Sequence, residues 1–202
     1  MASIYDLKPA FQRRLRPLAA RLAARGVTAN QVTITAFALS VIAGALVAIW
    51  PGAFLPLLLM PAALFARMTL NAIDGMLARE HGQKTRLGAL LNELGDVLSD
   101  AALYLPLALI PGVASRPVLI GVVLAVISEM TGVLGATIGA SRRYDGPMGK
   151  SDRAVVYGVL ALWLAFGLPT GFWIDGLLWF VVALLLATIW NRARGALRES
   201  PR

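Results

Sequence analysis

Six long apolar stretches alternate with short polar breaks along the chain. A helix that crosses a bilayer needs about 20 largely apolar residues, and five of the six stretches reach that length. The breaks contain the glycines, prolines and charged residues that end helices. The pattern predicts an all-α integral membrane fold with six transmembrane helices. The predicted spans cover residues 31–50, 53–79, 86–110, 117–141, 154–169 and 172–191.

The first 27 residues show a different pattern, in which apolar positions recur at the spacing of one helical face. Lys and Arg side chains surround this stripe, as in helices that lie on an anionic membrane surface. We therefore predict an amphipathic juxtamembrane helix over residues 1–27 and a six-helix domain over residues 28–202. The alternative for the first segment is an ordinary amphipathic helix that packs on a soluble partner. The stripe consists of Ile4, Leu7, Phe11, Leu15, Leu18 and Leu22.

Basic residues are unevenly distributed among the polar breaks. The seven segments that flank or join the predicted spans, with the span ends at residues 79 and 86 included in the third, contain 6, 0, 3, 1, 4, 0 and 4 Lys or Arg residues in chain order. Cytoplasmic loops carry the excess of Lys and Arg, so both termini and the two basic loops are predicted to be cytoplasmic. The net charge of +8 is thereby explained without a nucleic-acid partner.

The composition narrows the possible chemistry. The chain is 58% hydrophobic and 15% charged, whereas soluble domains are about 45–50% apolar and about 25% charged. It has no cysteine, which excludes disulfides and thiolate metal sites. His81 is the only histidine, so a multi-histidine metal site is also excluded.

Two of the predicted spans, 53–79 and 86–110, carry polar residues on one helical face near their cytoplasmic ends. Ionisable residues at such depth are costly in a membrane and are a functional hypothesis by default. If the short connection makes the two spans antiparallel neighbours, their faces meet in a pocket that opens to the cytoplasm. The faces consist of Arg67, Asn71, Asp74 and Ala78, and of Gly88, Asn92, Asp96 and Asp100.

Oxygen ligands dominate this predicted pocket. Carboxylate and amide oxygens suit a hard cation such as Mg²⁺ or Mn²⁺, which typically joins carboxylates to substrate phosphates. Gly75 and Gly88 lack a side chain, so a nucleotide or phosphate can approach the backbone beside them. The structural alternative is a polar seam that only holds helices together.

The same residues carry a resemblance to a known family. The CDP-alcohol phosphotransferase (CDP-alcohol phosphatidyltransferase) family has the signature D-x2-D-G-x2-A-R-x8-G-x3-D-x3-D, and this chain resembles it at every spacing. Asn71 and Asn92 depart from it, at the family's first and third acids. "TANQVT" at residues 28–33 is also similar to the family's pattern at the start of the first span. The matching positions are Asn71, Asp74, Gly75, Ala78, Arg79, Gly88, Asn92 and Asp96.

The resemblance implies a reaction and a site. Family members move a phosphatidyl or similar phosphoalcohol group from a CDP-linked lipid donor, such as CDP-diacylglycerol, to an alcohol, and they release CMP. It implies one or two Mg²⁺ or Mn²⁺ ions, with Asp96 as the catalytic base. A homodimer in a bacterial-type cytoplasmic (inner) membrane is also implied. The implied metal ligands are Asn71, Asp74, Asn92 and Asp96, and the implied nucleotide-binding residues are Asp74, Gly75, Ala78, Arg79 and Gly88.

Asn71 and Asn92 change the charge of the implied metal site. An amide oxygen can bind a metal but has no formal charge, so the four signature positions carry −2 rather than −4. Either metal affinity is weaker, or only one metal stays firmly bound, or the site prefers another donor geometry. A catalytically degenerate member that acts as a membrane scaffold is one alternative function. A transporter with a polar metal-binding core is the other.

The polar break at residues 142–153 lies on the same predicted side as the pocket. Lys150 and Arg153 are candidates for binding an anionic acceptor or a lipid phosphate, and the alternative is that they only set the topology. Glycerol 3-phosphate is the first acceptor that we predict, because it is common in the family and suits two cations. Inositol phosphate, serine and a second lipid are the alternatives. Ser151 or Asp152 is predicted to cap the following helix.

Three charged residues are expected near the middle of the membrane and need partners. Arg67, Asp100 and Glu129 lie at a similar predicted depth on three different spans. We expect Arg67 to pair with Asp100 or Glu129, because an unpaired charge at that depth costs several kcal/mol.

Small residues on the fourth predicted span also bear on assembly. Gly132, Gly135 and Gly139 permit close helix contact. They are predicted to serve either a homodimer interface or packing within one chain.

Overall fold

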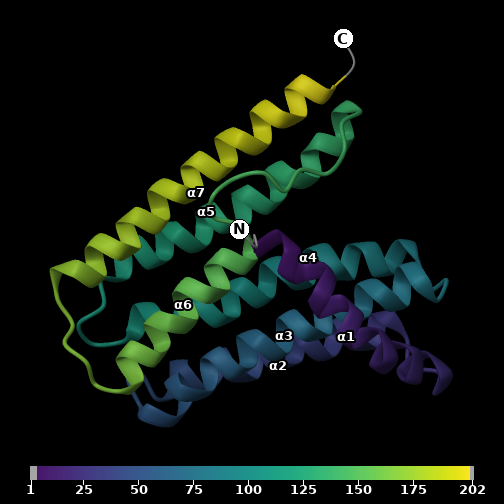
Figure 1. Ribbon diagram of the computed structural model, residues 1–202. Coiled ribbons are helices and arrows are strands. Elements are labelled where there is room, and N and C mark those ends of the chain that lie inside the picture. The colour runs from purple at the N-terminus through teal and green to yellow at the C-terminus, as the bar shows by residue number, and fades with distance from the viewer. Residues whose placement is uncertain (1–3, 201–202) are drawn as a thin grey trace.

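The computed structural model describes the backbone of residues 4–200 and the side chains of residues 10–200 (Figure 1). Within this range the chain forms helices and no strands. The side chains of Ile4 and Leu7, and Arg202, lie outside the described residues. The helices are α1 (Ile4–Ala24), α2 (Ala29–Ile49), α3 (Phe54–Glu80), α4 (Arg86–Tyr104), η1 (Leu105–Leu109), α5 (Ser115–Leu134), η2 (Gly135–Ile138), α6 (Lys150–Ala165) and α7 (Phe172–Glu199).

Four stretches of the described chain are long and apolar enough to cross a membrane. They correspond to the first, second, fourth and sixth predicted spans. The other two predicted spans are α4, which carries the polar face, and α6, which has 16 residues. An all-helical fold with membrane-spanning helices is therefore confirmed, whereas the count of six spans stays a prediction. The four stretches are Ala29–Ile49, Phe54–Glu80, Ser115–Ile138 and Phe172–Glu199.

Threonines fix the beginnings of α2 and α4. The Thr28 hydroxyl accepts a hydrogen bond from the Gln31 N–H at 3.2 Å, and the Gln31 side chain accepts one from the Thr28 N–H at 2.9 Å. This reciprocal pair is a capping box, which satisfies donors that would otherwise lack partners in the first helical turn. The Thr85 hydroxyl accepts the N–H of Gly88 at 2.9 Å and so begins α4.

The beginning of α6 differs from its predicted position. The Asp152 carboxylate accepts the N–H of Gly149 at 2.9 Å. Gly149 is the N-cap residue, so Asp152 stabilises the helix start from its third position and is not the N-cap that was predicted. The cap starts the helix at Lys150, four residues before the predicted span of 154–169, and the helix ends at Ala165. Lys150 therefore lies on a helix and not in a loop, and the rigid first turn of α6 fixes its position.

The helices form two groups, which meet where α4 and η1 pack against α5 (Figure 1). In one group α2 packs against both α3 and α4, and α1 packs on α3 near the ends of these helices. In the other group α5 packs against α7, while α6 packs against α3. The buried core between the groups contains Tyr104 of α4 and Tyr157 of α6, whose rings stack with centroids 4.1 Å apart. This packing brings the polar faces of α3, α4 and α6 toward one another.

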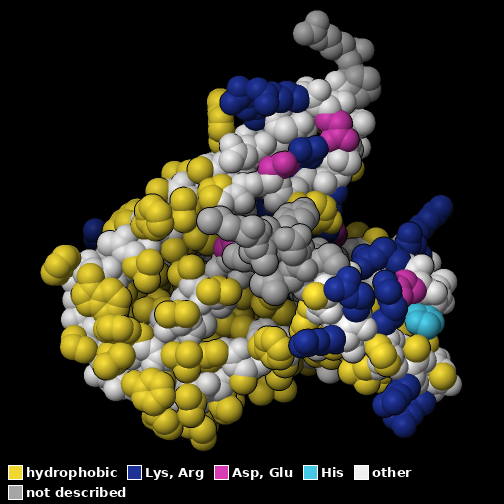
Figure 2. All heavy atoms as spheres, in the orientation of Figure 1, with side chains coloured by type: hydrophobic (Ala, Val, Ile, Leu, Met, Phe, Trp, Pro, Cys, Tyr) yellow, Lys and Arg dark blue, Asp and Glu magenta, His cyan; other side chains and the backbone are white. Residues whose placement is uncertain are grey.

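Charged and apolar side chains separate on the surface. Figure 2 shows hydrophobic side chains over the left part of the molecule, where the α2–α3 and α6–α7 connections lie. Lys and Arg side chains gather at the right and at the top, near α1 and the end of α7. An apolar surface with a basic end is the distribution expected of a membrane-embedded bundle.

Candidate active site

The polar faces predicted on α3 and α4 contact each other. Asn71 donates through Nδ2 to Oδ1 of Asp96 at 3.0 Å. Arg67 donates through Nη2 to the backbone carbonyl of Asp96 at 2.9 Å and forms an ion pair with Asp100. The predicted partner of Arg67 was Asp100 or Glu129, and the structure confirms Asp100. Both helices also pack on α2, so the polar contact is held between three helices.

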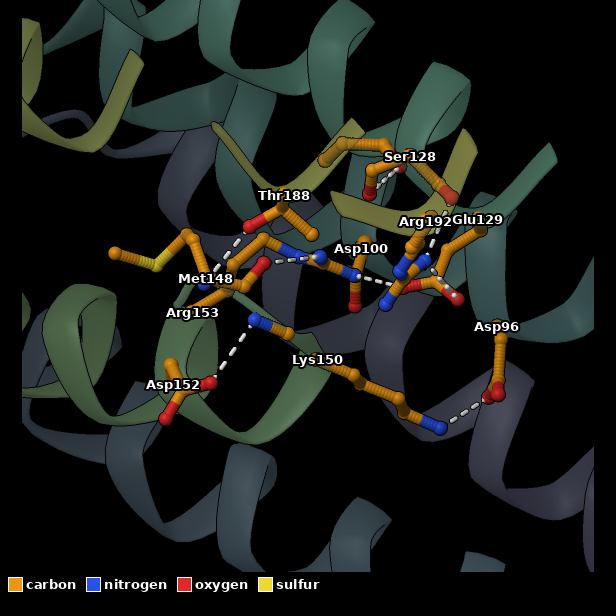
Figure 3. A network of polar contacts seen from close by, with 12 residues as sticks. Asp96, Asp100, Ser128, Glu129, Met148, Lys150, Asp152, Arg153, Thr188 and Arg192 are labelled. Atoms are coloured by element: carbon orange, nitrogen blue, oxygen red, sulfur yellow. Dashed lines mark hydrogen bonds and ion pairs between the residues drawn. The ribbon is translucent and has the colours of Figure 1, made fainter. Parts of the chain in front are cut away.

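Lys150 completes the surroundings of Asp96. Figure 3 shows its side chain reaching from α6 to Asp96, and its ammonium forms an ion pair with Oδ1 of that carboxylate. Arg67 Nη2 lies 3.6 Å from the same oxygen. The Asp96 side chain nevertheless keeps 18% of its surface exposed, so a small molecule can still reach the carboxylate.

Asp74 is the second carboxylate of the signature. It is buried on α3, and its Oδ2 accepts a hydrogen bond from the Thr33 hydroxyl at 2.8 Å. Asp74 lies one helical turn after Asn71 on α3, and Asn71 contacts Asp96, so the two aspartates lie on the same pair of facing helices. Thr33 belongs to the segment TANQVT, for which the sequence predicted no contact with the site.

The two signature glycines make room for polar side chains of the chain itself. A Cβ atom at Gly75 would lie 2.8 Å from Nη2 of Arg79. A Cβ atom at Gly88 would lie 2.7 Å from Oδ1 of Asn30 and 2.9 Å from Oγ1 of Thr85. A side chain at either position would displace these groups, which lie at the predicted nucleotide-binding end of α3 and α4.

The other signature positions occupy different surroundings. Ala78 is half buried and packs against an apolar cluster formed by α1, α2 and α3. Asn92 is half buried one turn before Asp96, and within the described residues its side chain has no hydrogen bond. Its amide is therefore available to a ligand.

Arg153 is the most completely buried of the predicted site residues, with 1% of its surface exposed. Its Nε and Nη2 donate to Oδ2 of Asp100 at 2.9 and 2.7 Å, and Nη2 also donates to Glu129 at 2.9 Å (Figure 3). Its Nη1 donates to the carbonyl of Met148 at 3.3 Å. Two carboxylates thus hold the guanidinium one turn along α6 from Lys150.

Two more arginines, Arg192 and Arg142, contact Glu129. The sequence did not predict either of them as a partner of this carboxylate. Arg192 of α7 lies 3.3 Å from Glu129 and donates to the carbonyl of Ser128 at 2.6 Å. Arg142 lies 3.6 Å from Glu129 and forms an ion pair with Glu93 of α4. The last predicted span ended at residue 191, so Arg192 was counted as a loop charge. Arg192 lies four residues after Thr188 and seven after Leu185, on the buried face of α7, and this spacing was the signal available in the sequence.

The loop that leads into α6 is fixed by ion pairs of its own. Arg143 donates to Asp145 at 2.7 and 3.0 Å and pairs with Glu199. The hydrogen bonds from Arg143 lower the pKa of the Asp145 carboxyl below its usual value. These contacts hold residues 141–149 against α7 and so support the position of Lys150.

The glycines of the fourth predicted span pack within the chain. A Cβ atom at Gly132 would lie 2.6 Å from the carbonyl oxygen of Arg143, and one at Gly135 would lie 3.0 Å from that of Ser141. Gly139 has a φ of +82° and ends η2. Of the two predicted roles, close packing within one chain applies to Gly132 and Gly135.

The donor set of the site fits a divalent cation. Asp74 and Asp96 supply carboxylate oxygens, and Asn71 and Asn92 supply amide oxygens, which are the ligands that Mg²⁺ and Mn²⁺ prefer. The ammonium of Lys150 against Asp96 shows that this carboxylate attracts a cation. Across residues 10–200, no group of three or more Asp, Glu, His or Cys side chains could hold a metal, so an ion would also need amide, phosphate or water oxygens.

Comparison with known sequences gives a family and full-length relatives. The profile of the CDP-alcohol phosphatidyltransferase family matches residues 26–190, which include the whole signature. The inner membrane protein YnbA of Escherichia coli (strain K12) is 45% identical over 199 residues, which are 98% of each chain. The phosphatidylinositol phosphate synthase of Streptomyces avermitilis is 31% identical over 201 residues, covering 94% of this chain and 80% of that protein.

Comparison with solved structures gives the same fold. A crystal structure of the Mycobacterium tuberculosis phosphatidylinositol phosphate synthase with CDP-DAG bound matches with a TM-score of 0.68 and 24% identity, over 94% of this chain and 96% of that one. A crystal structure of the same synthase in complex with manganese and citrate matches with a TM-score of 0.66 and 24% identity, over 92% and 89%. The arrangement of helices around the signature is thus shared.

Proposed function

The chain belongs to the CDP-alcohol phosphatidyltransferase family, and we propose that it moves a phosphatidyl group from a CDP-linked lipid, such as CDP-diacylglycerol, to a small polar alcohol. CMP is the second product. The members of this family are transferases of substituted phosphate groups. The observation that supports the proposal best is the contact of Asp96 with Asn71 and Lys150, which gathers side chains of α3, α4 and α6 at the signature.

Asp96 is proposed as the base. Its Oδ1 accepts hydrogen bonds from Asn71 and Lys150, which leaves Oδ2 to accept the proton of the acceptor hydroxyl. The acceptor oxygen then forms a bond to the lipid phosphorus, and the bond from that phosphorus to the CMP oxygen breaks. Arg67 holds the Asp96 carbonyl at 2.9 Å and so keeps the carboxylate in place.

Members of this family depend on divalent metal ions. We propose that Asp74 and Asp96, with amide oxygens of Asn71 and Asn92, hold Mg²⁺ or Mn²⁺. When bound, such an ion would neutralise part of the charge of the diphosphate and would stabilise the leaving CMP. Thr33 orients the Asp74 carboxylate through its hydrogen bond.

The nucleotide is proposed to bind along the signature glycines. Arg79 is exposed and lies over Gly75, so its guanidinium can turn toward a phosphate without a change of backbone. Ala78 and Gly88 keep the neighbouring surface free of large side chains. A hollow beside Gly88 is lined by Thr28, Ala29, Asn30, Gln83 and Thr85.

Lys150 is the proposed contact for an acceptor phosphate. Glycerol 3-phosphate and an inositol phosphate are the leading candidates, the first from the sequence and the second from the phosphatidylinositol phosphate synthases among the relatives. Each carries a phosphate that can pair with the ammonium. Arg153 donates to Asp100 and Glu129, so we propose that it supports the acceptor site by holding α6 against α4 and α5.

The protein is membrane-embedded, and we propose a specific topology for it. α4 and α6 cross the membrane together with the four apolar helices, and α1 lies on the membrane surface. Both termini and the site face the cytoplasm of a bacterial-type inner membrane, as the Lys and Arg distribution indicates. The working unit is proposed to be a homodimer, whose contact cannot use Gly132 because that glycine faces the chain's own loop.

A membrane scaffold without catalysis is the second candidate. Asn71 and Asn92 favour it, because they remove two of the four signature charges. The retained pair of Asp74 and Asp96 favours the enzyme, because it keeps the proposed base and a charged metal ligand.

The experiment is CMP release by the purified full chain from CDP-diacylglycerol. The reaction is run with Mg²⁺, with Mn²⁺ and with a chelator, over glycerol 3-phosphate, inositol phosphate, serine and a lipid alcohol, and products are identified by mass spectrometry. Metal-dependent release with one acceptor supports the enzyme. Binding of CDP-diacylglycerol without release for any acceptor supports the scaffold.

A further inference from the structure

The signature of this chain supplies few carboxylates to bind a metal ion. Asp74 and Asp96 are the two that its signature supplies, because Asn71 and Asn92 stand at the other two ligand positions. Each divalent ion prefers an oxygen-rich shell with at least one charged ligand. If the proposed function is correct, the number of ions that the site holds depends on what else is charged nearby.

The other acids near Asp96 along α4 are already paired. Glu93, one turn before Asp96, forms an ion pair with Arg142. Asp100, one turn after it, is buried and pairs with Arg67 and Arg153. Removing the buried Asp100 from its two arginine partners would leave uncompensated buried charges, so Asp100 cannot serve as an extra metal ligand at low cost. The Glu93 side chain is 30% exposed, and a metal ion would have to compete with Arg142 for its carboxylate.

A cation of the chain itself occupies one oxygen of Asp96. The ammonium of Lys150 pairs with Oδ1, and the same oxygen accepts from Nδ2 of Asn71 at 3.0 Å. A carboxylate oxygen can only accept, so the Asn71 amide turns its nitrogen toward it. An aspartate at position 71 would instead oppose a like charge at this point. The three side chains form a consistent set in which Lys150 and Asn71 satisfy Oδ1.

The charges of the site then limit its metal content. Asp74, Asp96 and Lys150 sum to −1, one divalent ion brings the sum to +1, and a second would bring it to +3. We infer that the site binds one divalent ion per chain, held by Asp74 and by one lone pair of Asp96 Oδ2, whose other lone pair stays available for the acceptor proton. The ammonium of Lys150 supplies the positive charge that a second ion would supply.

The test is the number of Mn²⁺ ions bound by the purified full chain in detergent, measured by electron paramagnetic resonance without an acceptor. The wild type is expected to bind one ion. Lys150→Ala removes a repelling charge and is expected to lower the Kd for Mn²⁺ by about tenfold. Lys150→Arg keeps the charge and is expected to match the wild type. The triple variant Asn71→Asp, Asn92→Asp, Lys150→Ala is expected to bind two ions.

Lys84→Ala is the matched control, because Lys84 is an exposed lysine in the α3–α4 connection and its loss should leave Mn²⁺ binding unchanged. Two ions of similar affinity on the wild-type chain would overturn the inference, and this count needs no variant. An unchanged Kd in Lys150→Ala would also overturn it and would leave Lys150 as an acceptor contact alone. CMP release is measured in parallel. Turnover by a chain that binds two ions would refute the inference and support the proposed function. One bound ion without turnover would support the inference and refute the proposed function.

Discussion

The two signature aspartates have different surroundings, and these suggest different roles. Asp74 is buried and accepts a hydrogen bond from Thr33, whereas Asp96 is partly exposed and accepts from two side chains at one oxygen. A base must meet its substrate proton, while a metal ligand needs a fixed position. The exposure therefore favours Asp96 as the base and Asp74 as a ligand.

Replacing each aspartate by asparagine should separate the two roles. Asp96→Asn is expected to lower CMP release by about 10²–10⁴-fold, because it removes general-base catalysis. Its binding of CDP-diacylglycerol should be largely retained. Asp74→Asn is expected to raise the Mn²⁺ concentration needed for half-maximal release. Both effects are measured by titrating Mn²⁺ against CMP release.

Asp175→Asn is the control for this pair, because Asp175 contacts the N–H of Ala114 in another part of the molecule. Near-normal turnover in Asp96→Asn would show that Asp96 is not the base. A shifted metal dependence in Asp175→Asn would show that the assay reports a general loss of stability.

Arg153 allows a second test at the residue scale. Arg153→Met leaves Asp100 and Glu129 each without one of their partners, and breaking a buried pair costs about 3–5 kcal/mol. The variant is expected to unfold at a clearly lower temperature, as followed by tryptophan fluorescence in detergent. Arg198→Met, at an exposed arginine of α7, should leave the unfolding temperature unchanged. An unchanged temperature with a raised KM for the acceptor would instead assign Arg153 to acceptor binding.

At the scale of single helices, the two more polar helices, α4 and α6, supply residues of the candidate site. α4 and α6 are the two predicted spans that lack a long apolar stretch, and they supply Asp96 and Lys150. Both helices pack against more apolar ones, α4 on α2 and α6 on α3. Their polar residues are therefore directed into the bundle, and the short first turn of α6 determines where the Lys150 ammonium lies.

The glycine that supports the 141–149 loop gives a prediction for this scale. Gly132→Ala would place a Cβ atom 2.6 Å from the Arg143 carbonyl oxygen, so the loop must move. The expected result is a lower unfolding temperature and a raised KM for the acceptor, because the loop leads directly into Lys150. Gly176→Ala is the matched control, since a Cβ atom there meets nothing within 4 Å. Equal behaviour of the two variants in thermal unfolding and acceptor titration would contradict this account.

The sequence predicted the contacts that depend on depth within one pair of helices. The spacing placed Arg67 at the depth of Asp100, and this pair is in contact. The contact of Asn71 with Asp96 joins the same two predicted faces, although this pair was not predicted. The depth of a residue in the membrane does not determine which face α6 turns toward α3 and α4. The contact of Lys150 with Asp96 was therefore not predicted, because it depends on how α6 packs on α3 and on a cap that starts the helix early.

The same limit applies to the network around Glu129. Arg153 and Arg192 lie near the ends of their predicted spans and were interpreted as topology signals or as an acceptor site. Periodicity along one helix carries no information about charges on its neighbours. Their burial against Glu129 depends on how α5, α6 and α7 pack against one another.

At the scale of the whole molecule, the proposed reaction requires the site to lie at one membrane face. The headgroup of the lipid donor and the polar acceptor both lie in water, while the acyl chains of the donor stay in the bilayer. Figure 2 shows the Lys and Arg side chains gathered toward the end where α1 and the end of α7 lie. The signature lies near this end, since α3 ends at Glu80 and α4 begins at Arg86.

Reporter fusions test this orientation directly. Fusions after residues 82 and 148 should be cytoplasmic, because each of these connections carries three or four Lys or Arg residues, counted over 79–86 and 142–153. A fusion after residue 114 should be external, because that connection carries one. The expected readout is fluorescent-protein signal at the first two positions and alkaline phosphatase activity at the third. The reverse pattern would place the signature on the outer face, away from cytoplasmic nucleotides, and would refute both the topology and the proposed source of the CDP-linked donor. Four crossings instead of six would place residues 82 and 114 on the same side, so the same three fusions also test whether α4 crosses the membrane.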